Sequence, residues 1–262
     1  MKKFSQKFYF GFIMAFLYLP LIYLIVYSFN EEKSSVWKGF TFKWYKALFN
    51  DQLIMQSLYN TLIIALLASL IATILGTMAA IGIFNFKGGF RSVIQNVSNI
   101  PIINPEIVTG VSLMLLFTLT GVAFGFEMGF ATVLLAHIGF CTPYVILNVM
   151  PRLKRMDISI YEAALDLGCS PMKAFFKVVL PEIMPGIFSG MLISFTYSLD
   201  DFVITYFTRG SKFQTLPIQI YTMTHQRLNP KAYALSTILF ITILTILIVI
   251  NIRGDKAEKK ST

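Results

Sequence analysis

The stretch PRLKRMDISIYEAALDLGCSPMKAFFKVVLP, residues Pro151–Pro181, is the longest segment between the apolar runs of this chain. Its first half places apolar residues at the spacing of an amphipathic helix, at Ile158, Tyr161, Leu165 and Leu167. Gly168 predicts the end of that helix. Ser170 followed by Pro171 predicts the start of a second helix, which should end before Pro181. The stretch therefore predicts a helix–turn–helix whose apolar and basic side chains contact another protein or the bilayer surface.

The chain as a whole has the composition of a membrane protein. Of its 262 residues, 56% are hydrophobic and 13% are charged, whereas about 25% of a soluble domain is charged. Six runs are long and apolar enough to cross a bilayer: Phe8–Phe29, Leu58–Phe84, Ile100–Leu119, Met128–Met150, Ile183–Phe207 and Tyr233–Ile252. Inside lipid each backbone polar group must be paired within its own segment, so these runs are helices. The sequence predicts an all-α polytopic membrane protein with six transmembrane helices.

The Lys and Arg residues predict the orientation in the membrane. Counted over the loops of such a six-helix chain, 14 of the 22 lie on the side that holds both termini, and 8 lie on the other side. The positive-inside rule then places both termini in the cytoplasm. The net charge of +9 is in this interpretation a topology signal, and nucleic acid is not an expected partner. The basic start Met1–Lys7 continues into an apolar run that is too long for a signal peptide.

Motifs for catalysis are absent from the sequence. It has no G-x-x-x-x-G-K-[ST], HExxH, CxxC or G-x-S-x-G pattern. The two histidines, His137 and His225, fall in different predicted environments, one in a span and one in an external loop. We therefore expect no enzyme activity, no metal and no cofactor on this chain.

Small residues predict close packing between helices. The second span has Ala68, Ala72, Gly76 and Ala80 at four-residue spacing. The fifth span has Gly186 and Gly190 at the same spacing. Small side chains on one face allow a second helix to approach closely in lipid.

A specific resemblance starts from the stretch quoted first. Glu162-Ala163-Ala164, then Gly168, then Val178 and Leu180-Pro181 resemble the EAA loop of ABC importer permeases of type I. The resemblance implies a cytoplasmic coupling helix that lies in a cleft of a separate ABC ATPase dimer, and it implies that ATP and Mg²⁺ bind to that partner. Ser159 and Glu162 also fit a capping box, which is a structural interpretation of the same residues.

A second resemblance covers most of the chain. Ser194–Met223 and Pro101–Phe117 are similar to the second permease subunit of spermidine/putrescine importers. This implies polyamine transport across a bacterial cytoplasmic membrane, an extracytoplasmic substrate-binding protein, and a second, non-identical permease subunit. Permeases for sulfate, iron or another cation share much of this plan. A secondary carrier remains the alternative of a different class.

Acidic residues inside the predicted spans are candidates for a cation pathway. Asp200 and Asp201 lie late in the fifth span, with Tyr197 and Tyr206 beside them, and Glu106 lies at the start of the third. Carboxylates and aromatic faces both attract ammonium groups, and an unpaired Asp in lipid is costly. The alternative interpretation is that one Asp caps a broken helix or pairs with a cation at a subunit contact. The prolines before Glu106 predict a helix break there.

The predicted organisation has three parts. Residues 1–56 hold the first span and an external loop. Residues 57–252 form a five-helix permease core that includes the loop at 151–181, and 253–262 form a cytoplasmic tail.

Overall fold

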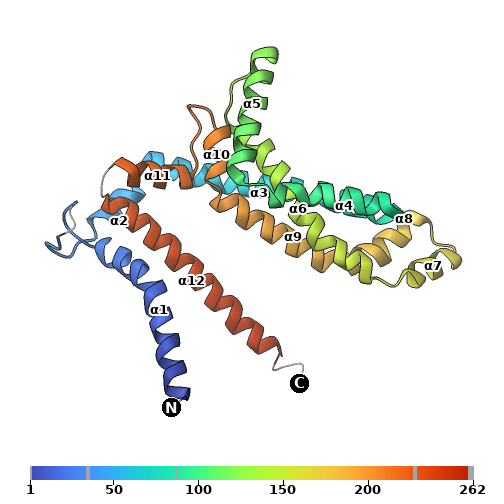
Figure 1. Ribbon diagram of the computed structural model, residues 1–262, viewed down its shortest axis with the longest axis horizontal. Helices are drawn as coiled ribbons and strands as arrows, with labels where there is room; N and C mark the ends of the chain where they lie inside the picture. Colours follow the sequence, from blue (N-terminus) through green and yellow to red (C-terminus); the bar gives the residue numbers. More distant parts are fainter. Residues whose placement is uncertain (1, 34–35, 87, 227–228, 259–262) are drawn as a thin grey trace. The chain divides into compact units, whose positions relative to one another are not determined.

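The computed structural model of the chain is helical throughout and forms two compact units (Figure 1). It describes every residue except 1, 34–35, 87, 227–228 and 259–262, and it describes no side chains for 2–6, 226, 243 and 246–258. Within the described residues the only β contact is an isolated bridge between Asn30 and Phe40. The first unit comprises residues 1–55 and 219–262, and the second comprises 56–218.

The first unit is built from helices at both ends of the chain. It contains α1 (Lys2–Tyr27), α2 (Lys43–Phe49) and α12 (Pro230–Glu258), and α12 packs against both other helices. Trp44 of α2 donates a hydrogen bond from Nε1 to the carbonyl oxygen of Asn30, at 2.7 Å. Lys231 forms an ion pair of 3.0 Å with Asp51. The compact unit thus groups the last helix with the first, whereas the sequence-based division grouped it with the core.

The second unit holds the remaining helices. Two of them, α3 (Gln52–Asn85) and α11 (Leu216–Gln226), run across the unit boundaries. The others are α4 (Gly88–Ile103), α5 (Glu106–Phe124), α6 (Phe130–Arg155), α7 (Ile158–Asp166), α8 (Pro171–Ala174), a π-helical turn η1 (Phe175–Val179), α9 (Leu180–Asp200) and α10 (Val203–Thr208).

Helix α6 lies at the centre of the second unit, between α3 and α9. Val145 of α6 is fully buried. A methyl group at Gly76 of α3 would lie 2.6 Å from Cβ of Val145, and one at Gly190 of α9 would lie 3.0 Å from its Cα. A methyl group therefore does not fit at Gly76 without a shift and would be tight at Gly190, and the small residues of the second and fifth spans pack as the sequence predicts.

Two of the predicted spans are interrupted. The third was expected to run from Ile100 to Leu119, but α4 ends at Ile103 and α5 begins at Glu106. The residue before a proline is disfavoured in helical conformation, and Pro105 therefore separates the two helices. The fifth span was expected to reach Phe207, but α9 ends at Asp200, since Asp201 adopts an extended conformation.

The helix–turn–helix stretch begins and ends differently from the prediction. Helix α6 continues through Pro151 to Arg155, and the second helix does not end before Pro181. Instead, α8 passes through η1 into α9, and the N–H of Leu180 bonds to the carbonyl oxygen of Phe175. This wider π turn ends at Val179, two residues before Pro181, whose ring and missing N–H do not fit the interior of a regular helix.

Among the residues that the structure describes, five helices are long and apolar enough to cross a membrane. They cover Lys7–Tyr27, Gln52–Asn85, Glu106–Phe124, Phe130–Arg155 and Pro171–Asp200. The sixth expected span, Tyr233–Ile252, falls within α12, where many side chains lie outside the described residues. The protein is therefore a helical polytopic membrane protein, and its count of six spans stays a prediction.

Candidate functional site

The side chain of Asp201, in the break between α9 and α10, caps the first turn of α10. Its Oδ1 accepts a hydrogen bond from the N–H of Ile204 at 3.2 Å. Its Oδ2 accepts one from the N–H of Thr205 at 2.8 Å and one from the Thr205 hydroxyl at 2.7 Å. The side chain is only 5% exposed. Of the two interpretations of the acid pair, helix capping is thus the one that describes the contacts of Asp201.

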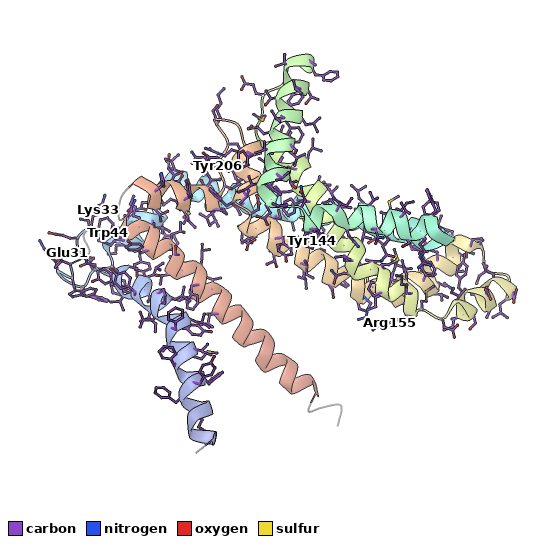
Figure 2. The ribbon with its side chains drawn as sticks, viewed as in Figure 1. Glu31, Lys33, Trp44, Tyr144, Arg155 and Tyr206 are labelled. Atoms are coloured by element: carbon purple, nitrogen blue, oxygen red, sulfur yellow. The ribbon has the colours of Figure 1, made fainter. Side chains whose placement is uncertain are left out.

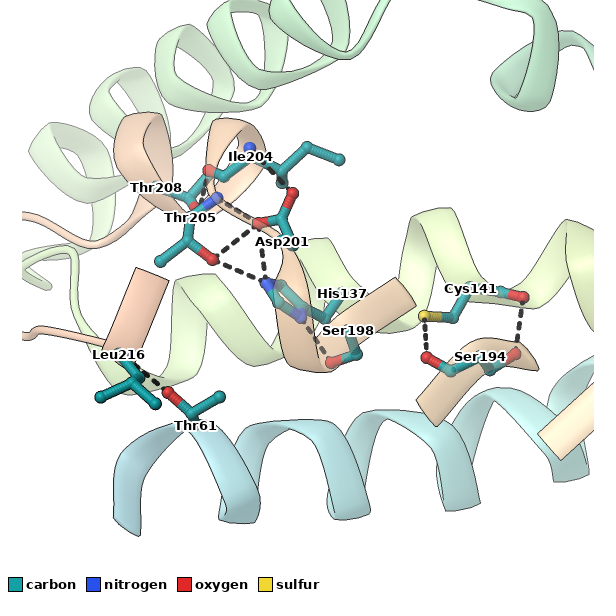
Figure 3. A network of polar contacts seen from close by, with 10 residues as sticks. All are labelled: Thr61, His137, Cys141, Ser194, Ser198, Asp201, Ile204, Thr205, Thr208 and Leu216. Atoms are coloured by element: carbon teal, nitrogen blue, oxygen red, sulfur yellow. Dashed lines mark hydrogen bonds and ion pairs between the residues drawn. The ribbon is translucent and has the colours of Figure 1, made fainter. Parts of the chain in front are cut away.

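His137 of α6 completes this network from the other side (Figure 3). Its Nδ1 lies 2.7 Å from the hydroxyl of Ser198, and its Nε2 lies 2.9 Å from the hydroxyl of Thr205. The same Nε2 lies 3.4 Å from Oδ2 of Asp201. The side chain of His137 is 1% exposed. The ring therefore connects α6 with the end of α9, with the break and with α10.

Asp200 is exposed, whereas the side chain of Asp201, which lines the same cavity, is almost completely buried. This cavity has a volume of about 280 Å³ and lies within the second unit. The cavity is lined by Pro101, Ile102, Asn104, Glu106, Thr109, Phe140, Tyr144, Tyr197, Asp200, Asp201, Phe202, Val203 and Ile204. Asp200 and Glu106 are both exposed, and among the described residues neither forms an ion pair. Two carboxylates without a cationic partner thus face one hollow.

Aromatic rings complete the wall of the cavity. Tyr144 of α6 and Tyr197 of α9 stack with their ring centroids 4.5 Å apart. The ring faces of such residues attract cations. Tyr206, which is labelled in Figure 2, does not line the cavity. Its ring centroid lies 5.5 Å from that of Phe202, and the Arg209 guanidinium lies 5.9 Å from it. Four of the five predicted pathway residues therefore meet at one place.

Several site residues were missed from the sequence. Tyr144 follows Pro143 in an apolar run and carries no signal of its own. Asn104 donates a hydrogen bond to the hydroxyl of Thr109 at 2.9 Å across the break between α4 and α5. His137 had a usable signal, because an ionisable residue inside a predicted span is a candidate for function.

The EAA residues lie at the far end of α6 and α9, on α7 and the segment that follows. Asp157, not Ser159, begins α7: its side chain accepts a hydrogen bond from the N–H of Ser159 at 3.0 Å. Hydrogen bonds from Ser159 lower the pKa of the Asp157 carboxyl. The capping box expected between Ser159 and Glu162 is therefore wrong. Glu162 and Ala163 are exposed, and Ala164 is half-buried.

The turn after α7 has the geometry that the sequence predicts. Gly168 has a φ of +83°, which favours glycine. Its N–H bonds to the carbonyl oxygen of Leu165, and the N–H of Cys169 bonds to that of Ala164. Large apolar side chains are exposed along this segment, namely Ile158, Ile160, Leu167, Met172 and Phe176. Leu180 and Pro181 begin α9 beside it.

Comparison with known proteins agrees with both resemblances. The chain is 35% identical over 251 residues to the spermidine/putrescine transport system permease protein PotC of Escherichia coli K12, covering 95% of this chain and 94% of that protein. It is 42% identical over 233 residues to the putrescine transport system permease protein PotI of the same strain, covering 86% and 82%. A crystal structure of a bacterial ABC transporter that imports the acidic polysaccharide alginate has a similar fold, with a TM-score of 0.75, 15% identity and 95% of each chain covered.

A family match covers most of the second unit and continues to the last helix. Residues 72–254 match the family described as binding-protein-dependent transport system inner membrane component. Membership explains why the chain lacks catalytic motifs, because its members are membrane components of transporters and not enzymes. With its apolar helices, the chain is a multi-pass protein of a bacterial inner membrane. The chain therefore belongs to the family of binding-protein-dependent transport system inner membrane components.

Proposed function

We propose that this chain is a permease subunit of an ATP-driven importer and that its cargo is a polyamine such as spermidine or putrescine. The observation that carries the cargo assignment is the cavity in which Asp200 and Glu106 face the same space without a cationic partner among the described residues. The two relatives that are 35% and 42% identical carry these polyamines in their names. The fold itself does not select the cargo, because an alginate importer shares it.

The chemistry of the cavity suits a flexible chain of ammonium groups. A cation that leaves water for a low-dielectric path needs fixed negative charge to offset its lost hydration. Asp200 and Glu106 supply such charge, and the stacked rings of Tyr144 and Tyr197 supply faces that attract an ammonium group or cover the methylene segments between such groups. Asp201 takes a structural part in this proposal, and Tyr206 takes none inside the cavity.

The coupling to ATP belongs to α7 and the turn after it. This segment would dock into a cytoplasmic ABC ATPase dimer, which would hold ATP and Mg²⁺. Support comes from the EAA residues Glu162, Ala163, Ala164, Gly168, Leu180 and Pro181, and from the apolar side chains exposed beside them. Exposed apolar residues at the end of a membrane helix bundle favour contact with a partner protein.

The remaining parts of the transporter follow from the family. The chain would receive its cargo from an extracytoplasmic binding protein, which the family description supports by the words binding-protein-dependent. It would pair with a second, non-identical permease subunit, as the resemblance to polyamine importers implies. Six spans with both termini in the cytoplasm agree with the distribution of Lys and Arg. Labelling of single cysteines at Lys43 and Lys173 tests this topology, because the two positions should react from opposite sides.

Uptake by proteoliposomes tests the cargo assignment. Vesicles that hold the transporter with its co-purifying subunits should import labelled spermidine or putrescine only when ATP is present on the side of the membrane that carries the ATPase. Asp200→Asn and Glu106→Gln should each reduce that uptake about tenfold, the effect of one lost contact of about 1.4 kcal/mol. Tyr206→Phe, outside the cavity, is the matched control. Competition by sulfate or iron instead of polyamines would reassign the cargo, and uptake driven by an ion gradient without ATP would indicate a secondary carrier.

A further inference from the structure

The hydrogen atoms around His137 can be assigned one by one. The Thr205 hydroxyl has a single hydrogen, and it donates this hydrogen to Oδ2 of Asp201 at 2.7 Å. At its 2.9 Å contact with Nε2 of His137 the same oxygen must therefore accept. Nε2 of His137 is thus a donor, and in the neutral ring the Ser198 hydroxyl donates to Nδ1 at 2.7 Å. Each polar atom in this buried cluster has a partner, and its arrangement is fixed.

This cluster controls the placement of α10. Six residues are too few to form a stable helix alone, and α10 is held by Asp201 at its first turn and by His137 through Thr205. On its other side α10 packs against α5: a methyl group at Gly110 would lie 2.8 Å from the ring of Phe207. Gly110 lies one turn after Glu106, the residue that begins α5.

The contacts therefore run from His137 to residues close to Asp200 on α9 and, through α10, to Gly110 of α5, one turn from Glu106. Ser198 and Asp201 flank Asp200 at the end of α9, and α10 carries the same constraint to α5, the helix that begins at Glu106. His137 itself does not line the cavity. Its effect on cargo must therefore be indirect, through the position of the groups that do.

We propose that His137 is a positioning residue for the cargo cavity: by holding Asp201 and α10 against α6, it sets where Asp200 and Glu106 stand relative to one another. Two fixed carboxylates favour cations whose charges have a matching spacing, and His137 thereby sets the preference between diamines and longer polyamines. The part on cargo rests on the proposed function, whereas the part on position does not.

Hydrogen exchange of the assembled transporter tests the positioning without any cargo. His137→Leu has a similar size and removes both ring contacts. Backbone amides of residues 202–208 and 106–110 should then exchange at least about tenfold faster, because both segments lose their anchor. Ser198→Ala removes only the Nδ1 contact and should produce a smaller increase in the same segments. If His137→Leu fails to assemble, this milder variant still decides the question.

Ser194→Ala is the matched control for both variants. The Ser194 hydroxyl makes another buried hydrogen bond between α9 and α6, to the carbonyl oxygen of Cys141 at 3.3 Å, away from the cavity (Figure 3). It should leave exchange at 202–208 and 106–110 unchanged. Unchanged exchange in these segments for both His137→Leu and Ser198→Ala would overturn the proposal, as would an equal increase for Ser194→Ala.

Uptake rates separate positioning from a general loss of folded protein. At saturating binding protein and cargo, Ser198→Ala and His137→Leu should change the ratio of spermidine to putrescine uptake by at least about threefold. A defect in folding alone lowers both rates by one factor and leaves the ratio unchanged, and that result would overturn the role in selectivity. If the unmodified transporter imports no polyamine, the proposed function fails, while the exchange data still decide whether His137 positions the cavity.

Discussion

The two ends of α9 depart from regular helix geometry in opposite ways. At its carboxyl end the chain breaks at Asp201, and the buried side chains of the break pair with Ser198, Ile204 and Thr205. At its amino end the helix widens into a π turn, and the adjoining α7 segment exposes its apolar side chains. A buried break with paired side chains fixes a site within the protein, whereas an exposed apolar segment needs a partner from outside. One membrane helix thus connects the candidate cargo cavity with the candidate ATPase contact.

The largest effect is expected from a substitution of Asp201, which caps the break at the carboxyl end of α9. Asp201→Asn keeps one acceptor oxygen and replaces the other by an NH₂ group, so either the N–H of Ile204 or the two donors of Thr205 lose their acceptor, and the charge beside His137 is lost. A buried donor left unpaired costs about 1–3 kcal/mol, so we expect about 3 kcal/mol of lost unfolding free energy. Thermal unfolding in detergent measures it. Asp200→Asn is the control and should change stability by less than about 0.5 kcal/mol; equal losses would contradict the comparison.

The second effect concerns the turn at Gly168, which follows α7 near the amino end of α9. Gly168 has a φ of +83°, and no atom lies within 4 Å of the position that a side chain would take. Gly168→Val is therefore disfavoured by its backbone alone, by about 1–2 kcal/mol. We expect α7 to lose its position and the ATPase to dissociate during co-purification. Gly82→Ala, at a helical glycine with equally open surroundings, should retain the ATPase. If Gly168→Val kept full ATPase association and uptake, this turn would not be part of the coupling element.

The third effect separates stability from partner contact. Leu167 is 87% exposed, so Leu167→Glu should leave unfolding within about 0.5 kcal/mol. If the α7 segment meets a partner, the same change should weaken ATPase association about fivefold, which corresponds to about 1 kcal/mol. A titration of purified ATPase against the permease in nanodiscs measures this. Unaltered binding for Leu167→Glu and Met172→Glu would show that the exposed apolar residues have another partner.

The smallest expected effect on stability comes from the ion pair between Asp51 and Lys231 in the first unit, and it is a baseline for the other effects. Burial raises the pKa of Asp51, but the hydrogen bond and charge of Lys231 and the N–H groups of Ile54 and Leu53 together lower it below its usual value. A lowered folded pKa gives stability that is present above the ordinary pKa of about 3.9 and is lost as the pH falls through the folded value. For this partly exposed pair we expect about 0.5 kcal/mol. Asp51→Asn should remove this pH dependence between neutral and acidic pH, and an unchanged profile would show that the ion pair is without effect.

The sequence predicted the helices and the close packing, because both depend on local patterns. Apolar runs located the membrane helices, and small residues at four-residue spacing located the contacts around Val145. Gly168 was placed correctly because a positive φ is a local requirement. The family followed from the EAA pattern and is confirmed by the comparisons.

Local sequence patterns did not predict where the helices break or which side chains contact one another in the candidate site. Nothing in the apolar run of the fifth span shows that it ends at Asp200, since the break is stabilised by His137, which lies more than sixty residues earlier in the chain. The π turn before Pro181 likewise packs against α7, a contact that no local pattern predicts. The sequence named Asp200 and Asp201 as a pair, but only their three-dimensional contacts distinguish a free carboxylate from a capping one.

The central claim is that these adjacent acids have separate tasks, and it is tested most directly by uptake per folded transporter. Labelled spermidine uptake is measured for Asp200→Asn and for the unmodified protein, with the amount of assembled complex determined in the same vesicles. We predict that Asp200→Asn assembles normally, keeps its unfolding temperature, and loses about tenfold in uptake per complex. Full uptake per complex with Asp200→Asn would contradict the account and would leave the cavity without its proposed cation contact.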